Sequence, residues 1–164
     1  MTPAVRIEAL GQPAPKGSGR AILIAGRARH VPSGSNVNRR NLQSWDSAVR
    51  AAALTTIGRV NAPPFVGQAL RVAIVFRLAR PGGHWGKRGI KPSKPLFPIG
   101  KPDVDKLARA TVDSLIGTVF DDDSRIVSLD AAKVWAAPGN EGASIVVEER
   151  TADAAARQPK EIDR

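Results

Sequence analysis

Hydrophobic and polar residues alternate along several short segments, which is the pattern of half-buried β-strands. The clearest segment is 70–78, where every second residue is large and apolar. Residues 5–10 alternate in the same way, and two short runs, 21–25 and 28–32, flank Gly26 and Arg27 as the arms of a hairpin do. Residues 126–135 and 144–149 are predicted to be two further strands that pair with each other around the turn-forming residues 138–142.

Two other segments repeat their apolar residues every three or four positions, as amphipathic helices do. The first is 39–57, which follows polar residues 33–38 that can cap a helix. The second starts near Val104 and ends before Gly117, a residue type favoured just past a helix end. Two main helices on one side of a small mixed or antiparallel sheet predict an α+β fold, although the pattern does not reveal the strand order.

The length of 164 residues predicts a single domain, residues 1–150, followed by a polar tail, 151–164, that is expected to be disordered. A Gly/Pro-rich basic loop, 80–102, interrupts the domain between the strand 70–78 and the second helix. The chain contains no cysteine, which excludes disulfides, thiolate metal sites and cysteine nucleophiles. It shows neither a signal peptide pattern nor a long apolar run, so we expect a soluble cytoplasmic protein without a membrane partner.

Charge is distributed unevenly along the chain, whose formal net charge is +10. Up to Pro102 there are 17 Lys and Arg against two acidic residues, whereas from Asp103 onward there are 8 against 13. A basic body favours a polyanionic partner, and a concentrated acidic segment favours a bound cation. An arginine-rich coding bias is the alternative explanation for the basic composition.

The acidic segment holds Asp103 and Asp105 at the start of the second helix and Asp121, Asp122 and Asp123 after its end. Carboxylates without His or Cys suit Mg²⁺ or Mn²⁺, ions that activate water and neutralise charge in phosphodiester hydrolysis. A helix of about 12 residues is about 18 Å long, so Asp123 reaches the first pair only if the chain doubles back.

Each acidic feature also has a purely structural interpretation. Asp105 could cap the helix, the three consecutive aspartates could form a solvated turn, and Arg109 could pair with Asp105 or Asp113, each four residues away.

Together, however, these features resemble a known family. The run PDVDKLARATVDSLIGTVFDDDSRIV is similar to the signature of the RusA family of Holliday junction resolvases: an Asp-hydrophobic-Asp pair that opens a helix, an aliphatic stretch, and a final pair of acids before an aliphatic strand. The resemblance is specific from Lys101 to about Trp135, and the order of the remaining elements agrees loosely.

The resemblance implies that Asp103, Asp105 and Asp123 bind Mg²⁺ as catalytic carboxylates, with Asp122 as the alternative to Asp123. Mn²⁺ is expected to substitute, and no small-molecule cofactor is expected. Arg109 stands where the family often has a catalytic lysine and so departs from the family pattern; its guanidinium can clamp a phosphate. The family acts as a homodimer with two active sites on branched DNA, and its members are commonly phage or prophage products.

Basic residues near the acids are the candidates for DNA contact: Lys87, Arg88, Lys91, Lys94, Lys101, Lys106 and Arg109. Trp85 and Phe97 lie among them, a mixture typical of an adaptable phosphate-binding loop, although a mobile basic linker has the same composition. Weaker candidates are Lys16, Arg39, Arg40 and Lys133. Lone histidines, His30 and His84, are expected to have surface or loop roles, and Trp45 and Trp135 to lie in the core or a dimer interface.

The leading hypothesis is therefore a Mg²⁺-dependent, structure-selective endonuclease that resolves Holliday junctions by symmetric hydrolysis during recombination and repair. One alternative is a metal-dependent nuclease with a different nucleic-acid substrate. The other is a non-catalytic basic DNA-binding protein, in which the aspartates are only a turn.

Overall fold

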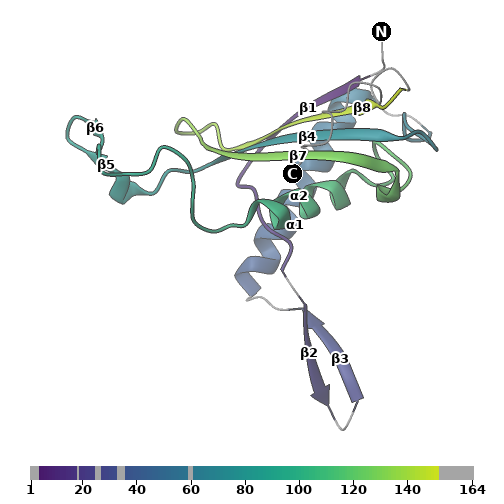
Figure 1. The fold of residues 1–164 in the computed structure, drawn as a ribbon, viewed down its shortest axis with the longest axis horizontal. Coiled ribbons are helices and arrows are strands. Elements are labelled where there is room, and N and C mark those ends of the chain that lie inside the picture. The colour runs from purple at the N-terminus through teal and green to yellow at the C-terminus, as the bar shows by residue number, and fades with distance from the viewer. Residues whose placement is uncertain (1–3, 18, 25–26, 33–35, 59–60, 152–164) are drawn as a thin grey trace, which may run out of the picture.

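In a computed structural model of the chain, a four-stranded sheet is covered on one side by two helices (Figure 1). The structure describes residues 4–17, 19–24, 27–32, 36–58 and 61–151. The sheet has the order β1-β8-β4-β7, and α1 and α2 cover it. Its elements are β1 (Ala4–Leu10), α1 (Asn36–Ile57), β4 (Leu70–Leu78), α2 (Val104–Leu115), β7 (Ile126–Trp135) and β8 (Gly142–Glu149). This arrangement confirms the predicted α+β class.

Smaller elements complete the fold. A hairpin of β2 (Gly19–Ile24) and β3 (Arg27–Pro32) confirms the predicted pair of short strands, while Ala25 and Gly26 of that prediction lie outside the described residues. The basic loop contains a 3₁₀ turn, η1 (Gly82–His84), and a two-residue hairpin of β5 (Trp85–Gly86) and β6 (Gly89–Ile90). Another 3₁₀ turn, η2 (Asp123–Arg125), precedes β7.

Strand β4 is the centre of the sheet because it pairs with β7 in parallel and with β8 antiparallel. The predicted direct pairing of 126–135 with 144–149 is therefore wrong, since β4 lies between them. The reason is that α2 forms a crossover connection, which places β7 parallel to β4 on one edge and leaves the other edge for β8. The local pattern of polar and apolar residues identifies each strand but cannot choose its neighbour.

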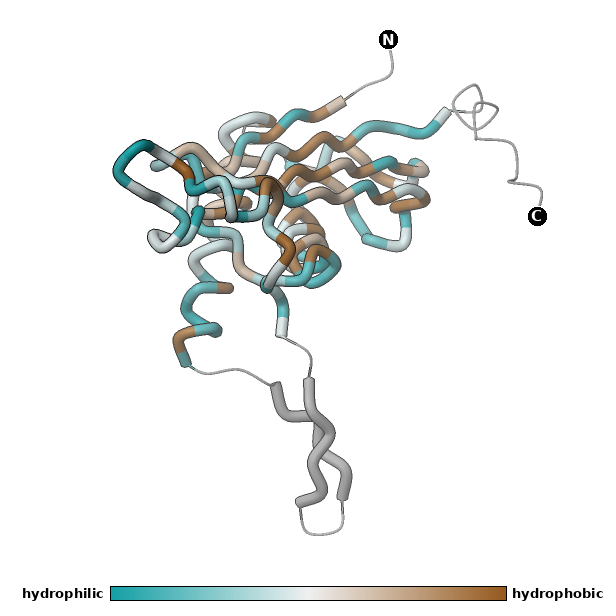
Figure 2. Tube along the Cα trace, turned by 60° about the vertical axis from the view of Figure 1, so that its left-hand side comes forward, coloured by the Kyte–Doolittle hydropathy of each residue, from teal (hydrophilic) through white to brown (hydrophobic). Residues whose placement is uncertain are grey.

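The core lies between the sheet and the helices. One face of β4 is fully apolar and buried, since its residues Leu70, Val72, Ile74, Phe76 and Leu78 alternate with more exposed ones. Figure 2 shows hydrophobic positions recurring along the strands of the sheet and along the helices. On the opposite face of the sheet, Arg71 of β4 pairs with Asp130 of β7 and Glu148 of β8. That ion-pair network ties three strands together on the side without helices.

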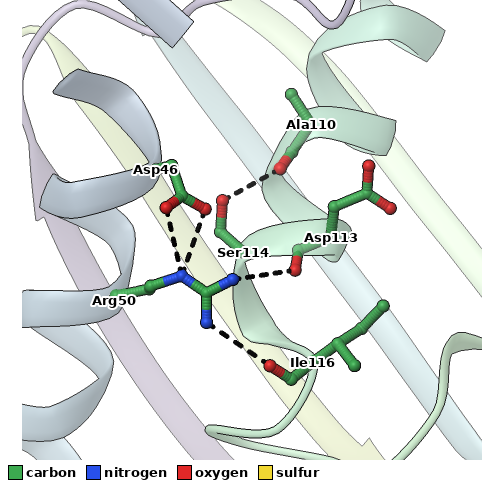
Figure 3. A network of polar contacts seen from close by, with 6 residues as sticks. All are labelled: Asp46, Arg50, Ala110, Asp113, Ser114 and Ile116. Carbon is green, nitrogen blue, oxygen red and sulfur yellow. Dashed lines mark hydrogen bonds and ion pairs between the residues drawn. The ribbon is translucent and has the colours of Figure 1, made fainter. Parts of the chain in front are cut away.

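Polar contacts join the two helices across their apolar seam. Trp45 is fully buried on α1, and its indole N–H donates to the hydroxyl of Thr111 on α2, which itself donates to the carbonyl oxygen of Leu107. Near the end of α2, Arg50 of α1 is held by Asp46 and donates to the carbonyl oxygens of Asp113 and Ile116 (Figure 3). These carbonyls have no partners within the helix, so Arg50 supplies a cationic C-terminal cap.

A close backbone approach explains one glycine at the start of β8. Gly142 has φ +154°, and a Cβ atom at this position would lie 2.1 Å from the carbonyl oxygen of Ala9. No side chain fits there without moving β1. No helix in the described part of the chain combines the length and apolar character that a bilayer crossing needs.

Candidate functional site

The two aspartates predicted to open the site lie at the N-terminal end of α2. Asp103 occupies the N-cap position but makes no side-chain capping bond, because its carboxylate pairs with Lys106 at 2.8 Å. Asp105 lies one residue inside the helix, in the first turn, and is exposed. The suggestion that Asp105 caps the helix is therefore wrong. Both carboxylates benefit from the positive end of the helix dipole.

Positive charge surrounds Asp103. The hydrogen bond from Lys106 lowers the pKa of Asp103, and the charges of Lys106, Lys101 and Lys133 lower it further. The same contact raises the pKa of Lys106. Asp103 is thus an anion at neutral pH, which is the form that binds a cation.

Lys133 connects the end of β7 to the backbone that leads into α2. Its ammonium donates to the carbonyl oxygens of Gly100 at 2.8 Å and Pro102 at 2.9 Å. These two bonds fix the residues directly before Asp103. Lys133, a weak candidate for DNA contact in the sequence, makes contacts in this structure that hold the backbone before α2.

The basic loop is anchored to β7 as well. The indole N–H of Trp135 donates to the carbonyl oxygen of Pro95 at 3.1 Å, and Arg80 donates to the same oxygen at 3.3 Å. The Arg80 guanidinium lies 5.0 Å from the Trp135 ring centroid, and His84 meets that ring edge-on at 5.5 Å. Trp135 is thus a loop anchor.

The cations of this loop face solvent to different extents. Lys87, Arg88, Lys91 and Lys101 are exposed, whereas Lys94 is half-buried. Lys91 also donates to the carbonyl oxygen of Gly83, which closes the β5–β6 hairpin region. The loop therefore presents positive charge from a folded scaffold rather than from an unanchored linker.

The second group of aspartates lies at the other end of α2. Asp122 caps η2 by accepting a 2.8 Å bond from the Ser124 amide, and hydrogen bonds from Ser124, first from its side chain and then from its backbone, lower the pKa of Asp122. Asp121 pairs with Arg125 and accepts from the Gly67 amide. Asp123 is exposed and begins the 3₁₀ turn. Among the described residues, Asp123 is thus the acid of this group whose carboxylate makes no hydrogen bond or ion pair.

Within a single chain, Asp123 does not lie beside Asp103 and Asp105, the other two predicted metal ligands. The chain does double back after α2, but as β7, which starts near Asp123 and reaches the Asp103 end only at Lys133. The 12 residues of α2 separate the two acidic groups by about 18 Å. Within the described residues, no cluster of three or more His, Cys, Asp or Glu side chains could hold a metal ion.

Arg109 is exposed on α2 and has no ion pair among the described residues, so the suggested pairing with Asp105 or Asp113 is absent. Asp113 pairs with Lys16 instead. That ion pair borders a surface hollow of about 500 Å³ between α1 and α2, which also includes Asp46 and Ser114. The hollow lies on the helix side and contains none of the candidate carboxylates.

Sequence reasoning missed the anchoring roles of Lys133 and Trp135. No local signal identifies them, because the parallel pairing of β7 with β4 is what brings them beside the loop. Their spacing of two residues on β7 shows only that their side chains lie on the same side of the strand.

Comparison with known proteins supports a nuclease. A family model described as endodeoxyribonuclease RusA matches residues 15–148, which is most of the chain and includes all of the candidate site residues. A search of curated proteins gave no match.

Proposed function

Since the chain belongs to the RusA family of endodeoxyribonucleases, we propose that it is a Mg²⁺-dependent enzyme that cuts branched DNA, with Holliday junctions as the substrate, during recombination and repair. The observation that carries this proposal is the pair Asp103 and Asp105 at the N-terminus of α2, framed by Lys101, Lys106 and Lys133. An anionic metal-binding pair inside a cationic frame suits a phosphodiester substrate.

The available donors fit a hard divalent cation. Asp103 and Asp105 offer carboxylate oxygens that Mg²⁺ prefers, and Mn²⁺ accepts the same ligands. A third carboxylate, Asp123, completes the proposed set, with Asp122 less suitable because it already caps η2. When bound, the ion supplies activation of water and neutralisation of charge on the phosphate.

The separation of the acids within one chain points to a homodimer. We infer that each site combines Asp103 and Asp105 of one protomer with Asp123 of its partner, because a single chain keeps them an α-helix apart. Two-fold symmetry then produces two identical sites, as paired cutting of a four-way junction requires.

The edge of the sheet offers a seam for this dimer. Strand β7 is an edge of the four-stranded sheet, and Val127 and Leu129 are exposed apolar residues on it. Antiparallel pairing of two such edges brings the start of one β7 beside the end of the other. This places the Asp123 end of one chain near the Lys133 and Asp103 end of its partner.

The remaining side chains bind and orient DNA. Lys101 and Lys106 lie beside Asp103 and attract the scissile phosphate, while Lys133 keeps the backbone before Asp103 in place. Arg109, one turn further along α2 and free of an ion pair among the described residues, suits a bidentate phosphate contact. The loop cations Lys87, Arg88, Lys91 and Lys94 extend this basic surface.

Cleavage of an end-labelled synthetic four-way junction with Mg²⁺ or Mn²⁺, beside an EDTA control, tests the activity. Paired symmetric nicks that require metal support the proposal. Preferential cutting of a flap, a linear duplex or structured RNA would favour a nuclease with another substrate. Salt-sensitive binding without any cutting would favour a non-catalytic DNA-binding protein.

Mixed dimers test the shared site. Two inactive variants, Asp103→Asn and Asp123→Asn, are mixed, unfolded and refolded together so that heterodimers form. If each site spans two protomers, the heterodimer contains one intact site and nicks one strand of the junction. If each site belongs to a single chain, both sites of the heterodimer are defective and no cutting returns.

A further inference from the structure

Three large apolar side chains of the basic loop project into solvent close to the candidate site. Leu96 is 83% exposed, Phe97 62% and Ile99 84%, whereas the intervening Pro98 is buried. We call Leu96, Phe97 and Ile99 the apolar knuckle. The knuckle has no role in the chemistry proposed above.

The backbone on both sides of the knuckle is anchored. Trp135 and Arg80 hold the carbonyl oxygen of Pro95 on one side, and Lys133 holds those of Gly100 and Pro102 on the other. Within the knuckle, the Ile99 amide donates to the Phe97 carbonyl oxygen at 3.0 Å. These bonds keep the apolar side chains presented to solvent instead of folded onto the core.

The charge of the loop indicates what covers the knuckle. The loop, residues 80–102, contains six Lys and Arg and no Asp or Glu. A second copy of the same loop is repelled by these charges, whereas a ligand with negative phosphates and flat apolar faces is attracted. Nucleic acid with exposed bases has both properties.

We propose that the apolar knuckle is a wedge that enters the branch point of the DNA and stacks against its bases, while the loop cations hold the flanking phosphates. The hydrogen bonds from Trp135, Arg80 and Lys133 hold this wedge on the segment that leads into Asp103. Opening of the branch point is therefore coupled to positioning of the DNA strand for cutting. Apolar side chains unstack base steps in many DNA-binding proteins, and unstacking costs least for bases that are not held in a regular duplex. This inference rests on the proposed function and specifies which part of the substrate the site recognises.

A four-way junction with 2-aminopurine at the branch point tests the wedge, because this base fluoresces more strongly when unstacked. Binding is measured in EDTA, which prevents cutting, with a second junction that carries the label within an arm. Wild-type protein is expected to raise the branch-point signal several-fold and leave the arm signal unchanged. Phe97→Ser combined with Leu96→Ser should lose most of this rise and bind the junction roughly 10-fold more weakly.

A matched control is Leu10→Ser, which changes a side chain that is also 62% exposed but lies on β1. It should behave as wild type. The knuckle variant should also keep the wild-type salt dependence of binding, since stacking releases no counterions. If the knuckle variant raises the branch-point fluorescence as much as the wild-type protein does, the wedge proposal is wrong.

Two further readouts separate the possible failures. If the knuckle variant becomes monomeric in sedimentation, the knuckle belongs to a protein interface and the wedge is overturned. If wild-type protein cuts junctions with Mg²⁺ but raises no branch-point signal, the wedge alone fails. If wild-type protein neither binds nor cuts junctions, the proposed function fails together with the wedge.

Discussion

The ammonium of Lys133 lies 2.9 Å from the carbonyl oxygen of Pro102, so a strand residue holds the backbone that directly precedes Asp103. The contact joins residues 31 positions apart. It fixes the N-terminus of α2, where the candidate metal ligands begin, relative to β7.

Loss of this contact is expected to affect catalysis more than binding. Lys133→Met should lower single-turnover junction cleavage by about 10- to 100-fold, because small misplacements of catalytic groups cost this much. Its junction affinity should fall only slightly. Arg6→Met, which removes an exposed charge on β1, serves as the control and should cut at nearly the wild-type rate. Equal losses in both variants would mean that Lys133 contributes only through general charge.

Asp105→Asn should abolish metal-dependent cleavage and leave junction binding intact or tighter, since the change removes repulsion between a carboxylate and phosphate. Gel-shift titration and cleavage of the same labelled junction measure the two effects. Asp130→Asn is a suitable control because Asp130 lies on the far side of the sheet in the Arg71 network. Wild-type cutting by Asp105→Asn would remove Asp105 from the site.

A charge on the β7 edge should prevent dimer formation. Leu129 is 48% exposed there, and Leu129→Glu is expected to give a monomer in sedimentation with cleavage reduced at least about 100-fold, because each site would lose its third carboxylate. Leu10→Glu alters an exposed leucine on the opposite edge strand, β1, and should leave the dimer intact. A stable, active Leu129→Glu dimer would place the seam elsewhere.

Gly142→Ala should destabilise the fold. The added Cβ atom would lie 2.1 Å from the Ala9 carbonyl oxygen, so β1 and β8 would have to separate. We expect a loss of about 2 kcal/mol or more, visible as a lower midpoint in thermal or denaturant unfolding. Gly83→Ala is the control, because a Cβ atom there meets nothing within 4 Å and its φ is not positive.

Acid should loosen the anchored end of the basic loop. Desolvation, followed by the charges of Lys94, Arg80 and Lys91, lowers the pKa of His84 below its usual value of about 6.5. The unfolded loop therefore binds a proton more readily than the anchored one. The contribution of His84 to the stability of the anchored loop is fully present above about pH 6.5 and declines as the pH falls below that value.

The indole N–H resonance of Trp135 reports this change, because His84 packs against its ring. It should shift between pH 7.5 and 5.5 in the wild-type protein and remain constant in His84→Gln. A shift of the same size in His84→Gln would show that another group titrates.

Most of the secondary structure could be predicted from the sequence because it depends on local periodicity. The apolar face of β4 and that of α2 are visible in the order of their residues, and α1 begins only three residues before its predicted start. Strand pairing was predicted incorrectly for β7 and β8 because adjacency depends on the crossover made by α2. That information is not contained in either strand.

For the candidate site too, the sequence predicts the local features but not the contacts that depend on the arrangement of the strands. The sequence identifies Asp103, Asp105 and Asp123 by residue type and by resemblance, and the cations around Asp103 by proximity. It cannot show that the helix between these acids keeps them apart, since this depends on where β7 returns. Lys133 and Trp135 acquire their contacts with the loop only through the parallel β4–β7 pairing.

The central position of β4 also determines when the sheet can form during synthesis. Each pairing within the four-stranded sheet involves either β7 or β8, and both emerge from the ribosome after β4. A nascent chain that ends before Ile126 therefore carries β4 with the backbone N–H and C=O groups of both its edges unpaired. Unpaired strand edges make an incomplete chain prone to aggregation, and the synthesis of β7 and β8 removes this exposure.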